Sequence, residues 1–371
     1  MRFIHTADWQ LGLRVRYIPG DAGAVVREAR LQTVATIGDL ARAQAADFVV
    51  VAGDVFEHHG LKPATLRKTF DVLAGYPCPV YLLPGNHDPF TPDSLYRAPL
   101  WKAACPPNVH ALGDDTPVLA APGAWILPCP LRERHTLDDP TDHLTPGFGP
   151  QGVIRVGLAH GGIREVLAGM RDPDDEALHN AIRIDAARAG GLDYLALGDW
   201  HGLLRVDDRT WYSGAPEPTR FKEKQPGYVL RVDIDAPGAP PRVEPHRVCT
   251  QTWVQHTATV RSAADLEDLE AALEALPDKR TTLLELFLEG TLDAADHARL
   301  GLTLEAFADR LLWLRRRDER LAATVGEADL DEIAADGWVR RVVDELRAHE
   351  KDEVAQNALR LLYQLHTEAT R

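Results

Sequence analysis

The sequence predicts an α/β fold of layered type, followed by a small α+β domain and a helical C-terminal region. Two observations support this prediction. Across residues 1–235, short apolar runs alternate with stretches whose apolar residues recur at helical spacing. Each apolar run also ends near an Asp, Asn or His. In layered α/β domains functional groups gather beyond the carboxyl ends of the strands, so we expect these side chains to converge on one crevice.

The expected elements follow one another in a regular order. The strands that end near polar residues cover 2–8, 47–54, 79–88, 153–162 and 192–202. Helices are expected over 31–46 and 63–76, where apolar residues lie three and four positions apart. The segment 47–54 is a nearly continuous apolar run, which is typical of a strand buried in a mixed or parallel sheet. Two closing strands are expected over 209–221 and 227–235.

A Pro- and Gly-rich segment around residues 235–245 is interpreted as a domain boundary. It leads us to expect three parts of the chain. They are an α/β domain, a small α+β capping domain and a helical C-terminal region, over 1–238, 246–302 and 303–371.

The last two parts have their own expected elements. In the capping domain, strands over 252–260 and 281–290 flank a helix over 262–276. Beyond it, 302–322 and 338–366 are interpreted as amphipathic helices, with Arg315–Arg317 on a solvated face. The C-terminal apolar residues either pack on the capping domain or dock a partner protein. They include Trp338, Val342, Leu346, Leu361, Leu362 and Leu365.

The composition is that of a globular protein with excess negative charge. The formal net charge is −15, whereas a protein that binds DNA unaided usually has a basic surface. Any binding to DNA is therefore expected to be local or shared with a partner. No apolar run is long enough for a membrane span, and the polar N-terminus differs from a signal peptide, which favours a cytoplasmic protein. The four Cys form no CxxC pair, so neither a zinc knuckle nor a disulfide framework is indicated.

Five short clusters of metal-ligand residues follow the expected strands. They are Asp8-Trp9-Gln10, Gly53-Asp54, Gly85-Asn86-His87-Asp88, His160-Gly161-Gly162 and Gly198-Asp199-Trp200-His201. Their oxygen and imidazole groups suit hard or borderline divalent cations. In the D-x-Q and D-x-H patterns, residues i and i+2 of an extended segment point to one side and can hold one ion. A lone strand-end Asp is usually a turn or cap residue, but five clusters in this order indicate a functional site.

The order of these clusters resembles the calcineurin-like metallophosphoesterase superfamily over residues 1–235. Within it, HTADWQLG, GDVFE and YSGAPEPTRF resemble SbcD-type nuclease subunits, which act in DNA repair with SbcC-type ATPases. The resemblance implies a layered α/β/β/α domain, a capping domain and a helical tail that binds the ATPase. It also implies two divalent ions, with Mn²⁺ expected before Mg²⁺ or Fe²⁺. A homodimer is a further expectation left open.

The resemblance assigns roles to individual residues. It gives the first ion to Asp8, Gln10 and His201, the bridging position to Asp54, and the second ion to Asn86, His160 and Asp199. His87 would face the substrate phosphate, and Asp88 would either orient its ring or serve as a turn residue. Gln10 and Asp199 stand where the family usually has His, which favours Mn²⁺ or Mg²⁺ over Zn²⁺. We interpret these two positions as a retuned site, with a degenerate site as the alternative.

Residues beside the clusters are candidates for contact with substrate, although loop arginines are as often merely solvated. The candidates are Arg14, Arg16, Glu57, His58 and Arg220. Together these features predict a metal-dependent DNA nuclease, with exonuclease and single-strand endonuclease activity, that acts with an SbcC-like coiled-coil ATPase. The alternatives are a phosphomonoesterase or small-molecule phosphodiesterase on the same site, and a non-catalytic scaffold.

Overall fold

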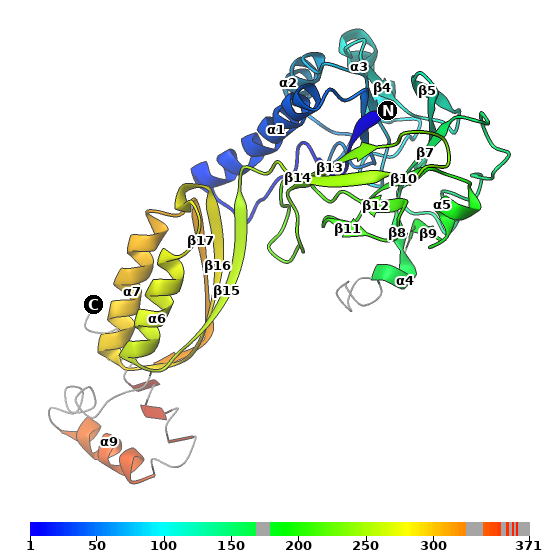
Figure 1. Cartoon of the computed structure of the whole chain (residues 1–371). Coiled ribbons are helices and arrows are strands. Elements are labelled where there is room, and N and C mark those ends of the chain that lie inside the picture. The colour runs from blue at the N-terminus through cyan, green and yellow to red at the C-terminus, as the bar shows by residue number, and fades with distance from the viewer. Residues whose placement is uncertain (168–178, 324–336, 350–353, 356–357, 360, 363–371) are drawn as a thin grey trace. The chain divides into compact units, whose positions relative to one another are not determined.

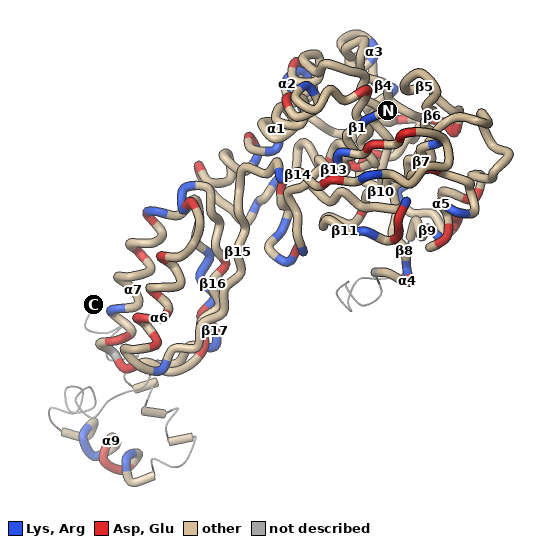
Figure 2. The backbone as a smooth tube through the Cα atoms, in the orientation of Figure 1, with Lys and Arg blue, Asp and Glu red and all other residues tan. Residues whose placement is uncertain are grey.

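The chain forms two compact units, Met1–Gln251 and Thr252–Arg371. The computed structural model describes residues 1–167, 179–323, 337–349, 354–355, 358–359 and 361–362 (Figure 1). Acidic and basic residues are interspersed over both units (Figure 2). Among the described helices, none combines the length and the apolar character needed to cross a membrane.

The first unit contains two six-stranded sheets, and the first of them carries the N-terminal strand. Its strand order is β14-β13-β1-β2-β3-β4. The four parallel strands are β1 (Arg2–Thr6), β2 (Phe48–Val51), β3 (Val80–Leu82) and β4 (Val109–Ala111). The antiparallel pair is β13 (Tyr228–Asp233) and β14 (Arg242–Arg247). The Pro- and Gly-rich segment lies within this hairpin, so the chain stays in the first unit beyond it.

The second sheet has the order β11-β12-β10-β7-β6-β5. Its strands are β5 (Val118–Ala121), β6 (Ala124–Cys129), β7 (Ile154–His160), β10 (Tyr194–Gly198), β11 (Leu204–Arg205) and β12 (Thr210–Tyr212). The neighbours β6, β7, β10 and β12 are parallel. Beside them, β8 (Gly162–Ile163) and β9 (Ala181–Ile182) form a two-stranded sheet.

The two sheets pack face to face through a shared apolar layer. Phe3 of β1 stacks on Phe48 at 4.9 Å between ring centroids and meets Tyr194 of the second sheet edge-on at 5.5 Å. Side chains alternate along each strand, so the neighbouring residues of β1 and β2 face the opposite way, toward helices. This alternation explains why both faces of the first sheet are apolar.

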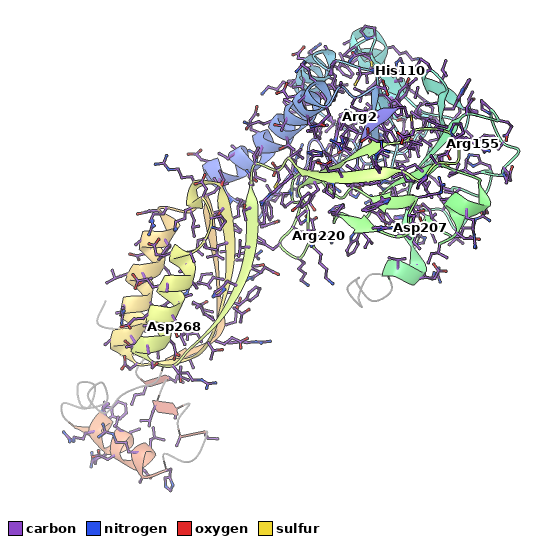
Figure 3. The ribbon with its side chains drawn as sticks, in the orientation of Figure 1. Arg2, His110, Arg155, Asp207, Arg220 and Asp268 are labelled. Atoms are coloured by element: carbon purple, nitrogen blue, oxygen red, sulfur yellow. The ribbon has the colours of Figure 1, made fainter. Side chains whose placement is uncertain are left out.

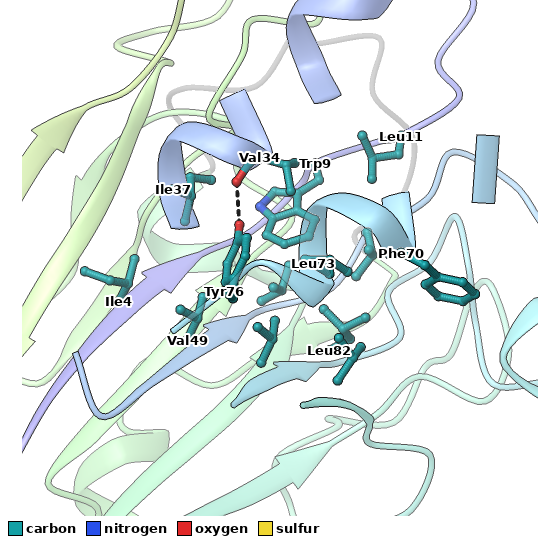
Figure 4. Close-up of a cluster of buried hydrophobic side chains, with 14 of the residues drawn as sticks. Ile4, Trp9, Leu11, Val34, Ile37, Val49, Phe70, Leu73, Tyr76 and Leu82 are labelled. Atoms are coloured by element: carbon teal, nitrogen blue, oxygen red, sulfur yellow. Dashed lines mark hydrogen bonds between the residues drawn. The ribbon is translucent and has the colours of Figure 1, made fainter. Parts of the chain in front are cut away.

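Helices cover the outer faces of both sheets. On the first sheet these are α1 (Gly20–Ala43), α2 (Pro63–Ala74), a short 3-10 turn η1 (Leu95–Arg97) and α3 (Pro99–Ala104). Figure 4 shows this layer, in which the hydroxyl of Tyr76 donates to the carbonyl of Val34 at 2.5 Å. α5 (Ala186–Ala189) packs on the second sheet, and α4 (Arg164–Leu167) follows β8. The expected layered α/β/β/α fold is confirmed. α1 begins at Gly20 rather than at Leu31, because Val26, Ala29 and Arg30 are also buried.

The second unit is a three-stranded parallel sheet with two helices. Its elements are β15 (Thr252–Val260), α6 (Ala263–Glu274), η2 (Lys279–Thr281), β16 (Thr282–Leu292), α7 (Ala294–Ala308) and β17 (Trp313–Ala323). The strand order is β15-β16-β17. Leucines of α6, α7 and β16 form one apolar core.

The prediction of a helix over 302–322 is wrong in its second half. α7 ends at Ala308, and Trp313–Ala323 is a strand that pairs with β16. Arg315 and Arg317 therefore lie on one face of the sheet, where both contact the buried carboxylate of Glu285, at 3.4 and 3.2 Å. Leu314, on the opposite face, packs against the core. The arginine run does not lie on a helix.

Only part of the expected C-terminal helix lies within the described residues. α9 (Trp338–Ala348) buries Val343 in a small cluster, and Val339 and Leu346 pack around it together with Leu362. Trp338 and Leu361 are exposed. Leu365 lies outside the described residues.

Candidate metal centre

The predicted ligand clusters converge at the carboxyl ends of β1, β2, β7 and β10. One ligand atom each from Asp8, Asp54 and His160 lies within 4.8 Å of the others, and all three side chains are buried. Asp8 follows β1, Asp54 follows β2, and His160 ends β7. The centre is therefore built where the two sheets meet, and neither sheet could form it alone.

Four of the predicted ligand residues have positive φ angles, which are unfavourable for residues other than glycine. The angles are 53° at Asp8, 44° at Gln10, 51° at Asp54 and 97° at Asp199. Such conformations cost on the order of 1–3 kcal/mol each and persist only where the surroundings enforce them. Here the amide of Asp8 donates to the carbonyl of Gly53 at 3.0 Å, and that of Gln10 donates to Asp54 at 2.9 Å. The fold holds the backbone of these four residues in unfavourable conformations, which is typical of functional sites.

Two glycines make the close approach of the ligands possible. A Cβ atom on Gly53 would overlap the ring of His160, and one on Gly85 would overlap the carboxylate of Asp54. Gly53 also has a φ of 89°. Any larger residue at either position would push a ligand away from the centre.

The side chain of Asn86 extends the donor set. Its amide lies 2.8 Å from Nε2 of His160, and also 3.1 and 3.2 Å from the two carboxylate oxygens of Asp54. The amide can take two orientations. With nitrogen inward it donates to Asp54, whereas with oxygen inward it adds a third type of ligand atom beside a carboxylate and an imidazole. The second orientation suits a divalent cation at this position.

The electrostatics of the centre also fit a cation. Burial, reinforced by the charges of Asp54 and Asp199, raises the pKa of Asp8 to about 6. Burial alone would lower the pKa of His160, but the carboxylates of Asp54 and Asp8 outweigh it and raise this pKa to about 9. A protonated His160 thus offsets negative charge in the metal-free chain. A divalent ion would take over this role and displace the proton, as metal binding to imidazole generally does.

On the other side of the centre, His201 is oriented by a carboxylate that the sequence analysis did not identify. Nδ1 of His201 donates to Oε1 of Glu223 at 2.6 Å, and the buried Glu223 also accepts from the amide and hydroxyl of Thr219. Nε2 is thereby left to face Gln10, whose amide nitrogen is 3.3 Å away. Burial would lower the pKa of His201, but Glu223 more than offsets this effect and raises it. A carboxylate behind a ligating imidazole is typical of metal sites, and the only signal in the sequence was its place just after the YSGAPEPTRF motif.

His87 lies at the edge of the centre and remains partly exposed. Its amide donates to Oδ1 of Asp54 at 2.9 Å, and its Nε2 is 3.9 Å from Oδ2 of Asp54. Nδ1 lies 3.3 Å from the carbonyl of Glu57 and 3.7 Å from its carboxylate. Since the carbonyl of Glu57 can only accept, Nδ1 donates to it in this arrangement and Nε2 is directed to the centre.

Asp88 does not orient the His87 ring, which corrects one of the two predicted roles. Its carboxylate is fully buried and accepts from the amides of Gly85 and Phe56 and from the hydroxyl of Tyr96, at 2.8, 3.0 and 2.6 Å. Burial, and then the charge of Asp54, raises the pKa of Asp88 to about 7. Asp88 fixes the turn that carries its neighbours, and Glu57 contacts the ring instead.

The other predicted substrate-binding residues lie in two places. Arg14, Arg16 and His58 line one cleft, which begins beside the centre. Arg220 lies on the loop between β12 and β13, labelled in Figure 3, with its Nε 3.8 Å from the Oε1 atom of Glu223. Arg220 is therefore next to the carboxylate that orients His201.

A buried cation also supports the centre and was not predicted. The guanidinium of Arg30, in α1, donates to the carbonyls of Trp9 and Pro218 at 3.2 and 2.6 Å. It ties the Asp8–Gln10 segment to the loop that carries Glu223. Nearby, the buried Glu217 accepts from the hydroxyl of Thr33 at 2.6 Å.

Comparison with known proteins agrees with this geometry. Residues 1–231, more than half of the chain, match the sequence family described as calcineurin-like phosphoesterase. The chain belongs to this family. Its relatives include proteins named as the SbcD subunit of the nuclease SbcCD. The SbcD subunit of Rhodobacter capsulatus is 28% identical to this chain, and the alignment covers 75% of this chain and 77% of the relative. The SbcD subunit of Escherichia coli K12 is 25% identical, and its alignment covers 99% of this chain and 98% of the relative.

A solved structure, that of TT1561 of Thermus thermophilus, covers 67% of this chain and 98% of its own. The TM-score is 0.40 at 12% identity. Membership of the phosphoesterase family identifies the chain as a hydrolase whose centre binds divalent metal. The buried set of Asp8, Asp54 and His160 is where the structure accommodates it.

Proposed function

We propose that this chain is a metal-dependent DNA nuclease that hydrolyses phosphodiester bonds at the centre formed by Asp8, Asp54 and His160. The observation that carries the proposal is the convergence of these buried ligands from three strands, two of which, Asp8 and Asp54, have the unfavourable backbone conformations that are typical of functional sites. The expected ligand sets extend from here, with Gln10 and His201 toward one ion and Asn86 and Asp199 toward the other. Asp54 is proposed as the ligand shared by both.

The protein side chains have separate tasks in this proposal. Bound divalent ions supply Lewis acidity and an acidified water for attack on phosphorus. His87 directs Nε2 toward the phosphate, and with both ring nitrogens protonated it would stabilise developing charge or donate the Nε2 proton to the leaving oxygen. Glu57 holds the proton on Nδ1 of that ring. Glu223 and Asp88 are positioning residues, which fix His201 and the Asn86–His87 turn respectively.

DNA is proposed as the substrate because the relatives that align with most of the chain are named as nuclease subunits. We propose exonuclease and single-strand endonuclease activity in DNA repair. The same names support a partner of the SbcC type, a coiled-coil ATPase, which would supply the DNA grip that a chain of net charge −15 lacks. A homodimer of this chain is compatible with such an assembly.

The activity is tested with bis-p-nitrophenyl phosphate and with end-labelled DNA. We expect the full-length chain to hydrolyse both with Mn²⁺, and to do so faster than with Zn²⁺, since Gln10 and Asp199 provide hard oxygen ligands. Hydrolysis of the small diester without cleavage of DNA would favour a small-molecule phosphodiesterase. The absence of any turnover with every divalent ion would favour a scaffold.

The partner is tested by deleting the chain after Leu330, a position outside the described residues. All predicted ligands precede it, so hydrolysis of the small diester should be retained, whereas capture of an SbcC-type ATPase should be lost. The apolar residues Val339, Val343 and Leu346 of α9 would form part of the docking helix. Full-strength capture by the truncated chain would exclude this role. Loss of diester hydrolysis by a folded truncated chain would show that the tail supports the centre instead.

A further inference from the structure

A cleft of about 870 Å³ opens beside the metal centre, between the loop 11–18 and the first turns of α1 and α2. Its lining is strongly basic, with six Lys or Arg side chains and a single acidic one. The basic residues are Arg14, Arg16, Arg27, Arg30, Lys62 and Lys68, and the acidic residue is Glu28. In a chain with 41 basic and 56 acidic residues, this local excess runs against the overall composition.

Four of these cations are available to a ligand. Arg14, Arg16, Arg27 and Lys62 are exposed, and among the described residues none of them has a carboxylate within ion-pair distance. The remaining two are engaged elsewhere. Lys68 lies 3.8 Å from Glu28, and Arg30 is buried and donates to main-chain carbonyls. The four exposed side chains therefore give the cleft a local excess of positive charge that no ion pair among the described residues offsets.

The cleft is continuous with the centre through two main-chain segments. The loop 11–18 follows directly from Asp8 and Gln10, and the wall formed by His58 follows directly from Glu57. The segments are held together, because the amide of Leu11 donates to Val55 at 2.9 Å and that of Glu57 donates to Leu11 at 3.1 Å. The buried side chains of Val15 and Ile18 anchor the loop from below.

We propose that this cleft binds the sugar–phosphate backbone of the DNA strand whose scissile bond occupies the metal centre. The inference rests on the proposed function and specifies where its substrate is held. A single small anion would require donors that converge on one point, whereas Arg14, Arg16, Arg27 and Lys62 lie on three separate segments along an open surface. Spaced, flexible cations of this kind suit successive phosphates and give affinity without sequence specificity.

The test measures binding without hydrolysis. Fluorescence anisotropy of a labelled mixed-sequence single strand is followed in EDTA, with the full-length chain, at a series of salt concentrations. The cleft variant carries Arg14→Gln, Arg16→Gln, Arg27→Gln and Lys62→Gln. The matched control, with the same change of charge, carries Lys102→Gln, Arg134→Gln, Arg188→Gln and Arg205→Gln, exposed residues of the same unit outside the cleft.

The cleft variant should bind at least about tenfold more weakly, and its plot of log affinity against log salt should be flatter by up to about 0.7 for each phosphate that is no longer bound. The control should match the wild-type slope, and both variants should retain the wild-type melting temperature. Equal slopes for the cleft variant and the wild type, or no binding by the wild type at low salt, would overturn the proposal. Stronger competition by poly-aspartate than by unlabelled DNA would also overturn it, because the cleft would then prefer an acidic polypeptide.

Failure of the cleft and failure of the proposed function give different results. If the wild type does not hydrolyse any diester but the cleft variant still loses salt-dependent DNA binding, the proposal that the cleft binds DNA is supported and the nuclease proposal fails. If the wild type cleaves DNA and the cleft variant binds like the control, the nuclease proposal stands and the strand is held elsewhere.

Discussion

The two compact units bury different kinds of side chain. The first unit buries many ionisable groups, among them Asp8, Arg30, Asp54, Asp88 and His160, and four residues at its centre have positive φ angles. In the described part of the second unit, the buried polar residues are Thr282 and Glu285, and the main core consists of leucines with Val260 and Phe307. Buried charge and unfavourable backbone conformation both reduce stability. The first unit is thus organised around chemistry and the second around packing.

Asp54→Asn should separate function from stability in the first unit. Asparagine has nearly the same shape as aspartate, and its side-chain oxygen can still accept the hydrogen bond from the amide of His87. The substitution removes one negative charge from the buried group of Asp8, Asp54 and His160. We expect diester hydrolysis to fall to the uncatalysed rate and bound metal to be lost, as measured by metal analysis of the purified chain. The melting temperature of the metal-free chain should not fall. A large loss of stability without metal would mean that the carboxylate is structural.

His87→Gln should reduce turnover and leave the metal in place. A group that donates a proton or stabilises charge is worth about a hundredfold to ten-thousandfold in rate. Because the His87 ring reaches the centre only at 3.9 Å from Asp54, both ions should remain bound. If metal analysis shows a depleted variant, His87 is a ligand rather than a catalytic residue.

Leu286→Ala, in the second unit, should reduce stability and leave hydrolysis unchanged. Leu286 is fully buried in the leucine core, and such truncations cost about 2–5 kcal/mol. The unfolding transition of this unit should shift, while diester hydrolysis by the folded chain stays at the wild-type rate. Leu302→Ala is the matched control, because Leu302 is exposed on α7 and its truncation should shift the unfolding transition very little. Parallel loss of hydrolysis would show that the second unit supports the centre.

Glu223→Gln should weaken metal binding without removing a ligand. Loss of an orienting carboxylate behind a ligating imidazole typically costs about 10–100-fold in metal affinity or activity. The readout is the Mn²⁺ concentration needed for half-maximal hydrolysis, which should rise while the rate at saturating Mn²⁺ changes less. Glu223→Asp should recover part of the affinity. An unchanged Mn²⁺ requirement in Glu223→Gln would show that Thr219 alone orients the ring.

His5 should make the first unit less stable as the pH falls. Burial lowers its pKa from 6.5 to about 3, although the bond from Nε2 to the carbonyl of Leu197 opposes this. The neutral ring, which also contacts the hydroxyl of Tyr194 at 3.0 Å, joins the two sheets behind the centre. Because the unfolded chain takes up the proton near pH 6.5, stability is fully present above that pH and is lost toward pH 3.

At pH 5 the loss attributable to His5 is about 2 kcal/mol. It is measured as the difference between wild type and His5→Phe in the change of unfolding free energy from pH 7 to pH 5. Asp8 and Asp88, whose pKa values are raised, act in the opposite direction but contribute equally to both proteins. The exposed His135→Phe serves as the control. An identical pH dependence in wild type and His5→Phe would show that the buried ring becomes protonated in place.

The sequence by itself determined the layered α/β fold and predicted the candidate metal ligands. These are local properties, since an apolar strand followed by Gly and Asp, or by Gly-Asn-His-Asp, has a recognisable pattern within a few residues. The family of the chain could be recognised from the same local patterns. The parallel strands β1 and β2 place Asp8 and Asp54 at one edge of the first sheet, whereas His160 ends a strand of the second sheet and joins them only because the two sheets pack face to face.

Only the tertiary structure decided which residues support the centre and which element Trp313–Ala323 forms. Glu223 and Arg30 act through contacts with residues more than 20 positions away, and no local pattern marks them. Asp88 lies next to His87 in sequence, yet its carboxylate turns to the amides of Gly85 and Phe56 because those buried donors need a partner. The arginine-rich segment is compatible with a helix, and pairing with β16 makes it a strand. Long-range hydrogen bonds and burial, rather than local preference, settle such segments.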